Sequence, residues 1–278
     1  MPVLDLHERD GFLVLDDEEC RAKGAALKSR YVNASPFPHV VVDDFIDAQV
    51  LRKVLEEFPS SHDMPYYKRS QERLKYQYGP KHWRGATTLN LFALFNSAAF
   101  VSFLEEMTGF DGLIPDAGYQ GGGLHETKPG GHLSVHADFN LHQKLGLIRQ
   151  LNLLLYLNDD WSPEFGGNLE LWDRGMQACE VAVAPELGRA VVFTTALDSF
   201  HGHPDPLTCP PDRSRRSMAL YYYTAPTDGL ADVPLRTTQF QIRPGSGDKT
   251  DWKVKTQHVV NDWVPLAVRR RLPKPKEQ

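Results

Sequence analysis

Three side chains of this sequence, His136, Asp138 and His201, have the types and the order of an iron-binding site. Two imidazoles and one carboxylate occupy one face of an octahedral Fe(II) and leave the other positions open to small molecules. His136 and Asp138 are two residues apart, so on a β-strand both side chains would project from one face. Arg215 adds a fixed cation for a carboxylate-bearing cosubstrate. This set indicates the chemistry of an iron oxygenase that consumes 2-oxoglutarate.

A surface turn and a zinc site are the alternatives for these histidines. A His-x-Asp triplet occurs by chance in surface turns, and His132 with His136 has the spacing of a zinc pair on one side of a helix. Residues 129–131, Pro-Gly-Gly, and the strand-like residues 133–135 argue against a helix here. We therefore favour a strand that carries His136 and Asp138.

Strand-like patterns also occur next to His201 and Arg215. The hydrophobic run 189–196 predicts a strand, and His201 lies just beyond it. Arg215 opens a second such run, in which alternation places Arg215 and Ser217 on one face and Arg216 on the other. We assign the inward position to Arg215.

A series of ordered motifs extends the pattern from about residue 115 to 225. They are Tyr156-Leu-Asn-Asp-Asp-Trp161, Gly166-Gly-Asn-Leu-Glu-Leu-Trp172, the stretch from Pro185 through Phe193, His201, and Arg215-Arg-Ser217. In this order they resemble the iron- and 2-oxoglutarate-dependent prolyl 4-hydroxylase family, in the branch that includes the hypoxia-sensing prolyl hydroxylases. The resemblance implies a double-stranded β-helix, or jelly-roll, core supported by N-terminal helices.

The resemblance also implies roles for individual residues. His136, Asp138 and His201 would bind Fe(II), and no catalytic residue beyond the metal centre is expected. Arg215 would pair with the distal carboxylate of 2-oxoglutarate, with hydroxyl groups from Tyr156 and Ser217; the alternative role of Tyr156 is a core aromatic. O2 would be the second cosubstrate, with ascorbate as a candidate accessory. Related halogenases have a small residue in place of the carboxylate, so an aspartate favours hydroxylation.

The chain departs from the family upstream of the triplet. Relatives commonly have a tyrosine about ten residues before it, and here His125 stands near that place. Residues 66–84 are rich in basic and aromatic side chains and form a candidate substrate lid; the alternative is a hairpin whose aromatics cover the core. His125, Arg73 and Trp83 are the candidate substrate contacts. The substrate itself would be an amino acid, a peptidyl residue such as proline, or a small biosynthetic metabolite, and the insertion at 66–84 favours a small molecule.

Composition limits the other classes of protein to which the chain could belong. A chain of 278 residues with 41% hydrophobic residues can bury a large core, and its net charge of −5 argues against a broad nucleic-acid-binding surface. Three cysteines without paired spacing indicate neither a zinc knuckle nor a disulfide scaffold. The first residues lack a basic and apolar leader, and no stretch has membrane-spanning length, so we expect a cytoplasmic protein without a membrane partner. The oligomeric state is not predicted.

The domain organisation that we expect is one elaborated dioxygenase domain over 1–278. Its parts are a helical and strand support with the candidate lid (1–112), the jelly-roll core (113–225) and a C-terminal extension (226–278). In the support we expect helices from a cap at Asp16 to about Arg30, from a cap at Asp47 over 50–58, and over 97–107 with Gly109 as the stop, and a strand over 37–43. The alternatives in function are a metal-binding cupin-like isomerase and a non-catalytic jelly-roll binding module.

Overall fold

The structure, a computed structural model, describes residues 1–60, 67–68, 70–142, 144–226 and 236–248. Four α-helices occur in this part of the chain, all before the core: α1 (Asp17–Val32), α2 (Ala48–Glu56), α3 (Ala86–Phe95) and α4 (Ala98–Thr108). Two short 3-10 helices, η1 (Pro80–His82) and η2 (Pro163–Phe165), lie in connections.

The three predicted helices begin where the sequence places their caps, but α1 ends at Val32 rather than Arg30, and α2 ends at Glu56 rather than Phe58. The side chains of Asp16, Asp47 and Ser97 accept hydrogen bonds from backbone N–H groups in the first turns of α1, α2 and α4. Gly109 ends α4 with a φ of +78°, a left-handed conformation that glycine adopts without a steric penalty. Helix α3 was not predicted.

The strands form a small N-terminal hairpin and one large antiparallel sheet. The hairpin pairs β1 (His7–Arg9) with β2 (Phe12–Val14). The order along the large sheet is β11 (Cys179–Val183), β10 (Leu169–Trp172), β13 (His201–His203), β7 (Gly123–Ala137), β14 (Arg215–Thr224), β9 (Leu147–Tyr156), β12 (Ala190–Thr194) and β3 (His39–Val42). The shorter strands β4 (Tyr67–Lys68), β5 (Glu72–Tyr78), β6 (Ile114–Pro115), β8 (Leu141–His142) and β15 (Gln239–Phe240) pair at its sides.

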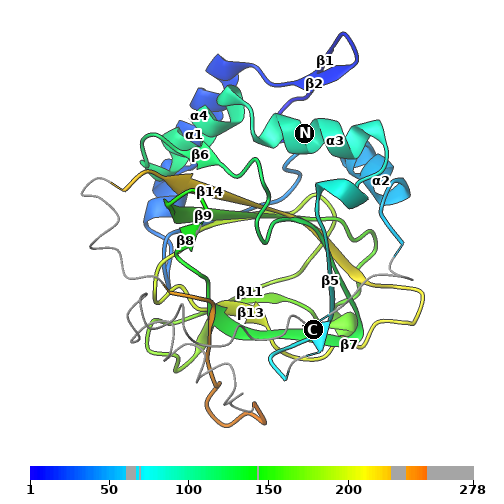
Figure 1. Cartoon of the computed structure of the whole chain (residues 1–278), viewed down its shortest axis with the longest axis vertical. Coiled ribbons are helices and arrows are strands. Elements are labelled where there is room, and N and C mark those ends of the chain that lie inside the picture. Colours follow the sequence, from blue (N-terminus) through cyan, green and yellow to red (C-terminus); the bar gives the residue numbers. More distant parts are fainter. Residues whose placement is uncertain (61–66, 69, 143, 227–235, 249–278) are drawn as a thin grey trace, which may run out of the picture.

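This sheet folds over into two layers (Figure 1). One layer contains β14 and β9 and is covered by the helices, while β13 and β11 lie in the other layer. The long strand β7 belongs to both, because its first half pairs with β14 and its second half with β13. Strand β5 runs along β7 and closes one side of the space between the layers. The predicted jelly-roll core with helical support is confirmed.

The main apolar core lies between the helices and the layer that contains β9 and β14. Phe95, Phe100 and Phe103 are buried there and pack against Phe45 of the loop after β3. Burying large aromatic side chains in this way is the principal stabilisation of the helical support. A second cluster, which includes Tyr156 and Phe193, packs one part of the space between the two layers.

Among the described residues, no single helix is long and apolar enough to cross a membrane. Helices α3 and α4, which meet at an angle of 47°, are together long and apolar enough to do so, by length and composition only. The largest apolar side chains of this pair are buried in the main core.

Candidate functional site

The strand register brings three residues from two distant segments to one point. His136 lies near the end of β7, Asp138 follows that strand directly, and His201 begins β13, where it pairs with His136 across the ladder. One ligand atom from each side chain lies within 4.8 Å of the others, the spacing of a metal site. Asp138 Oδ1 is 3.6 Å from His136 Nε2, and Asp138 Oδ2 is 3.4 Å from His201 Nε2.

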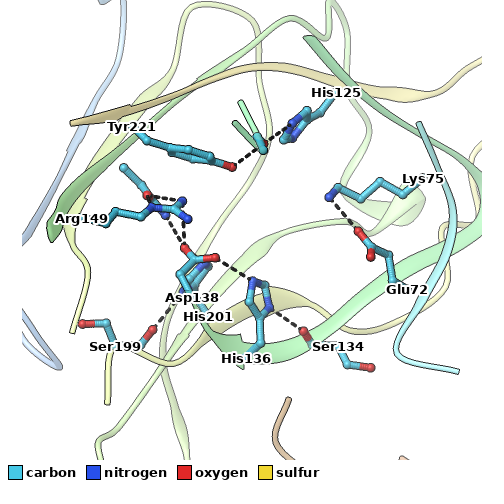
Figure 2. A network of polar contacts seen from close by, with 12 residues as sticks. Glu72, Lys75, His125, Ser134, His136, Asp138, Arg149, Ser199, His201 and Tyr221 are labelled. Atoms are coloured by element: carbon cyan, nitrogen blue, oxygen red, sulfur yellow. Dashed lines mark hydrogen bonds and ion pairs between the residues drawn. The ribbon is translucent and has the colours of Figure 1, made fainter. Parts of the chain in front are cut away.

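Backbone carbonyl groups fix the orientation of both imidazoles. His136 Nδ1 donates to the carbonyl of Ser134, and His201 Nδ1 donates to the carbonyl of Ser199, each at 2.9 Å (Figure 2). A carbonyl only accepts, so the proton is on Nδ1 and the lone pair of Nε2 faces the other ligands. Metal-binding histidines are typically held in this way, and the donor set therefore fits a divalent iron.

A buried arginine and an asparagine hold the carboxylate of Asp138. Its Oδ2 accepts from Asn152 Nδ2 at 2.7 Å and lies 3.1 Å from Arg149 Nη2. The guanidinium of Arg149 lies over the ring of Tyr221, 3.4 Å from its centroid. Burial acts to raise the pKa of Asp138, but Arg149 and the two imidazoles outweigh it and hold that pKa well below its usual range. Asp138 is thus a carboxylate, as a metal ligand must be.

The hydrogen bond from Asn152 to Asp138 can be removed without changing the charge of the site. We expect Asn152→Ala to weaken metal binding by about 10- to 100-fold, the usual effect of removing a hydrogen-bond partner of a ligand. The matched control is Gln150→Ala, a neutral amide on the same strand that bonds to Thr224 instead. Competition with a chelator for Zn(II) measures the metal affinity of both variants. Equal Zn(II) affinities in the two folded variants would contradict the expectation.

A second polar corner lies at the start of β14, where the Arg215 side chain lines the same cavity as the triad. The Arg215 residue is 6% exposed; its Nε donates to the carbonyl of Gly167 at 2.7 Å and its Nη2 donates to the hydroxyl of Tyr156 at 3.1 Å. Ser217 lines the cavity beside it, whereas Tyr156 does not line it and lies in the core. Arg216 points away and pairs with Glu126, as the alternation predicted.

The close approach of Arg215 explains why glycine occupies position 167 in the Gly166-Gly167 turn. Gly167 has a φ of +76°, and an added Cβ would lie 3.0 Å from Arg215 Cδ and 2.6 Å from a methyl group of Leu207. We expect Gly167→Ala to displace the guanidinium and to destabilise the fold by about 1–3 kcal/mol, the usual range for a strained backbone. Gly166→Ala is the matched control, since that residue has a similar φ of +68° with open space around its Cβ. Denaturant unfolding and 2-oxoglutarate affinity compare the two; only Gly167→Ala should lose affinity.

Both corners open into one cavity of about 280 Å³ between the sheet layers. Of the candidate substrate contacts, His125 lines it, with Nε2 bonded to the carbonyl of Gly121. Arg73 is exposed and does not line the cavity. Trp83 lies in the main core, stacked on Phe92 at 3.8 Å between ring centroids.

The candidate lid is, where described, a strand of the sheet. Residues 61–66 and 69 lie outside the described residues, but β5 pairs with β7 along most of its length. Tyr76, Tyr78 and Trp83 are buried in the main core, which is the alternative that the sequence left open. Glu72 and Lys75 on β5 line the cavity instead, so this segment is one of its walls.

Sequence reasoning missed several polar residues of the cavity, among them Glu72, Lys75, Arg149 and Asn152. For two of them a signal was present. Arg149 and Asn152 interrupt a strand of otherwise mostly apolar residues, 147–156, and an arginine in such a strand is expected to be paired. Glu72 and Lys75 carried no signal, since their spacing of three puts them on opposite faces of a regular strand.

Comparison with known proteins agrees with this geometry. Residues 122–223, which contain the triad and the Arg215 corner, match the family model described as the 2OG-Fe(II) oxygenase superfamily. The chain carries a 2OG-Fe(II) oxygenase domain. The domain is that of an iron- and 2-oxoglutarate-dependent oxygenase, whose cofactors are Fe(II), 2-oxoglutarate and O2. No curated protein matches the sequence.

Solved structures share this fold. A prolyl-4-hydroxylase from Pseudomonas putida aligns with a TM-score of 0.51 at 17% identity, over 73% of this chain and all of the other. A prolyl hydroxylase from Trichoplax adhaerens, solved with a hypoxia-inducible-factor peptide, gives 0.54 at 16% identity, over 74% and 91%. An epimerase of nogalamycin biosynthesis, SnoN, gives 0.50 at 14% identity, over 83% and 94%. At these identities the likeness shows the fold, and substrates do not transfer.

Proposed function

We propose that the oxygenase hydroxylates an unactivated C–H bond of a polar small molecule. The observation that carries this proposal is the cavity that contains both the triad and the Arg215 corner. Its volume of about 280 Å³ is at the lower end of ordinary small-molecule sites, of ~300–1,000 Å³, and it has to hold 2-oxoglutarate as well. A small substrate, or one side chain of a larger one, fills what remains.

The roles of the residues follow from their positions. His136, Asp138 and His201 would hold Fe(II) through the Nε2 atoms and the carboxylate. Arg215 would pair with the distal carboxylate of 2-oxoglutarate, because a buried guanidinium held by Gly167 and Tyr156 has a fixed orientation for an anion. When bound, the metal and 2-oxoglutarate supply the oxidation of the C–H bond by O2, with release of succinate and CO2.

The arrangement disfavours the two alternatives. A cupin-like isomerase has no need of a buried arginine corner beside the metal ligands, and a non-catalytic module has no need of the complete triad. Both sets are present, and the aspartate in the triad supports hydroxylation. We also propose a cytoplasmic setting, which the three free cysteines support, since Fe(II) persists in reducing compartments.

An anaerobic titration of the protein with Fe(II) and 2-oxoglutarate tests the proposed function. The chelate gives a visible metal-to-ligand charge-transfer band, and admission of O2 should then produce succinate. A folded protein that binds metal but develops no band would contradict the proposal. A peptide that raises succinate formation more than any small molecule would instead assign a peptidyl substrate.

A further inference from the structure

An ion pair faces the cavity from β5, away from the metal ligands and the Arg215 corner. Lys75 Nζ lies 2.8 Å from Glu72 Oε1, and both side chains line the cavity with only 14% and 12% exposure. Figure 2 shows the Lys75 side chain reaching from β5 into the space between His125 and the triad. The proposed function uses neither residue.

An irregularity in the pairing of β5 with β7 aims both side chains into the cavity. Residues three apart on a regular strand lie on opposite faces, but the register of β5 against β7 shifts between Arg73 and Lys75. Between these two pairs β5 has one residue, Leu74, with a φ of +50°, whereas β7 has four, Lys128 to Gly131, so the extra residues lie on β7. On β7 the opposing loop passes closely at Gly131, where a Cβ would lie 2.8 Å from the carbonyl oxygen of Arg73. The irregularity is therefore built into both strands.

This arrangement is costly to the fold. A non-glycine residue in the left-handed region costs about 1–3 kcal/mol and persists mainly at functional sites. Removing two charges from water costs more, and an apolar pair of the same volume is often as stable or more so. Stability does not account for Glu72 and Lys75, whereas a charged ligand does.

The charges of the cavity indicate what that ligand is. Its permanent charges are the cations of Lys75, Arg149 and Arg215 and the carboxylates of Glu72 and Asp138. Fe(II) and the 2-oxoglutarate dianion cancel each other, and Arg149, Arg215 and Asp138, which surround them, add a net charge of +1. Glu72 and Lys75 remain for the substrate, adjacent to each other and opposite in sign.

We infer, on the basis of the proposed function, that the Glu72–Lys75 pair selects a free α-amino acid, with Glu72 receiving its ammonium and Lys75 its carboxylate. The two charged groups of an α-amino acid are held on one carbon, a separation close to that of the pair. Each substrate charge then meets its opposite without leaving a buried charge unpaired. The side chain of the amino acid is left to extend toward the metal.

The test uses the anaerobic complex of the full chain with Fe(II) and 2-oxoglutarate, and the twenty proteinogenic L-amino acids as probes. We expect at least one free amino acid to shift the charge-transfer band and to raise succinate formation under O2. Its N-acetyl and methyl-ester forms should each bind at least about tenfold more weakly, because each loses one charge pair. If no free amino acid shifts the band, or if the capped forms bind equally well, the inference is wrong.

Variants assign the two charges. Glu72→Gln should lower the affinity for the free amino acid at least about tenfold but hardly change the affinity for its N-acetyl form, which has no ammonium group. Lys75→Met should likewise lower the affinity for the free amino acid but hardly change the affinity for its methyl ester, which has no carboxylate. The matched control is Arg73→Met, on the same strand but exposed. If Lys75→Met instead weakens 2-oxoglutarate binding, Lys75 serves the cosubstrate and the inference is wrong.

A double variant that exchanges the two charges controls for loss of folding. The double variant Glu72→Lys with Lys75→Glu keeps an ion pair and should keep the 2-oxoglutarate band, while affinity for the free amino acid falls at least about tenfold. Unchanged affinity would show that the pair is only structural. The wild-type band with 2-oxoglutarate alone separates the two proposals: its absence contradicts the proposed function, and its presence without any response to amino acids contradicts only this inference.

Discussion

Replacing His136 with alanine is expected to abolish the charge-transfer band and to reduce 2-oxoglutarate turnover by more than about 100-fold. The loss of even an outer partner of a metal ligand costs about 10- to 100-fold, and the loss of a ligand itself costs more. The structure gives the reason: His136 is paired with His201 across the ladder and oriented by Ser134, so its loss removes one of the three side chains that converge on the site. Anaerobic absorption spectroscopy and a succinate assay measure the two effects.

The matched control is a second histidine on the same strand. His132 lies four residues before His136 in β7, but it bonds to the carbonyl of Ser70 and does not line the cavity. His132→Ala should leave the band and the turnover unchanged. If both variants lost metal equally, the site would be the His132–His136 pair that the spacing allowed, and the assignment of the triad would fail.

Replacing Arg215 with methionine should raise the dissociation constant of 2-oxoglutarate by at least about 30-fold. Removing one partner of a buried, hydrogen-bonded charge pair costs about 2–5 kcal/mol, and each 1.4 kcal/mol is a factor of ten. Metal affinity should be nearly unchanged, because Arg215 bonds to Gly167 and Tyr156 and to none of the three metal ligands. Titrations of the metal-loaded protein with 2-oxoglutarate provide the measurement.

The neighbouring arginine provides the comparison. Arg216 has the same side chain one position along β14, but it pairs with Glu126 on the other face. Arg216→Met should bind 2-oxoglutarate as the wild type does. Equal losses in the two variants would mean that general charge, rather than the fixed corner, attracts the cosubstrate.

The parts of the site that sequence predicted are those fixed by local rules. Alternation along one strand placed Arg215 in the cavity and Arg216 outside it. Side-chain caps at Asp16 and Asp47 set the starts of α1 and α2. These features depend on neighbours within a few residues, so the pattern of residues suffices to predict them.

What sequence did not predict depends on irregular strands and on distant contacts. The left-handed backbone at Leu74, opposite a bulge in β7, changes the face of Lys75. A second bulge, at Gln150 of β9, allows Arg149 to reach Asn152. A bulge reverses the alternation on which a prediction rests, and no residue type marks its place reliably. Trp83 was misjudged for another reason: an aromatic side chain in a basic stretch serves the core as readily as a ligand, and only packing distinguishes them.

The pairing of His136 with His201 has a consequence for the survival of the protein in the cell. Strand β13 is three residues long and carries one of the proposed metal ligands, whereas the other two belong to β7 and the residue after it. The unfolded chain holds no such site, so iron binds the native state selectively and adds about 2.7 kcal/mol of stability at a concentration 100 times its dissociation constant. Iron scarcity would then shorten the lifetime of this oxygenase as well as abolish its activity.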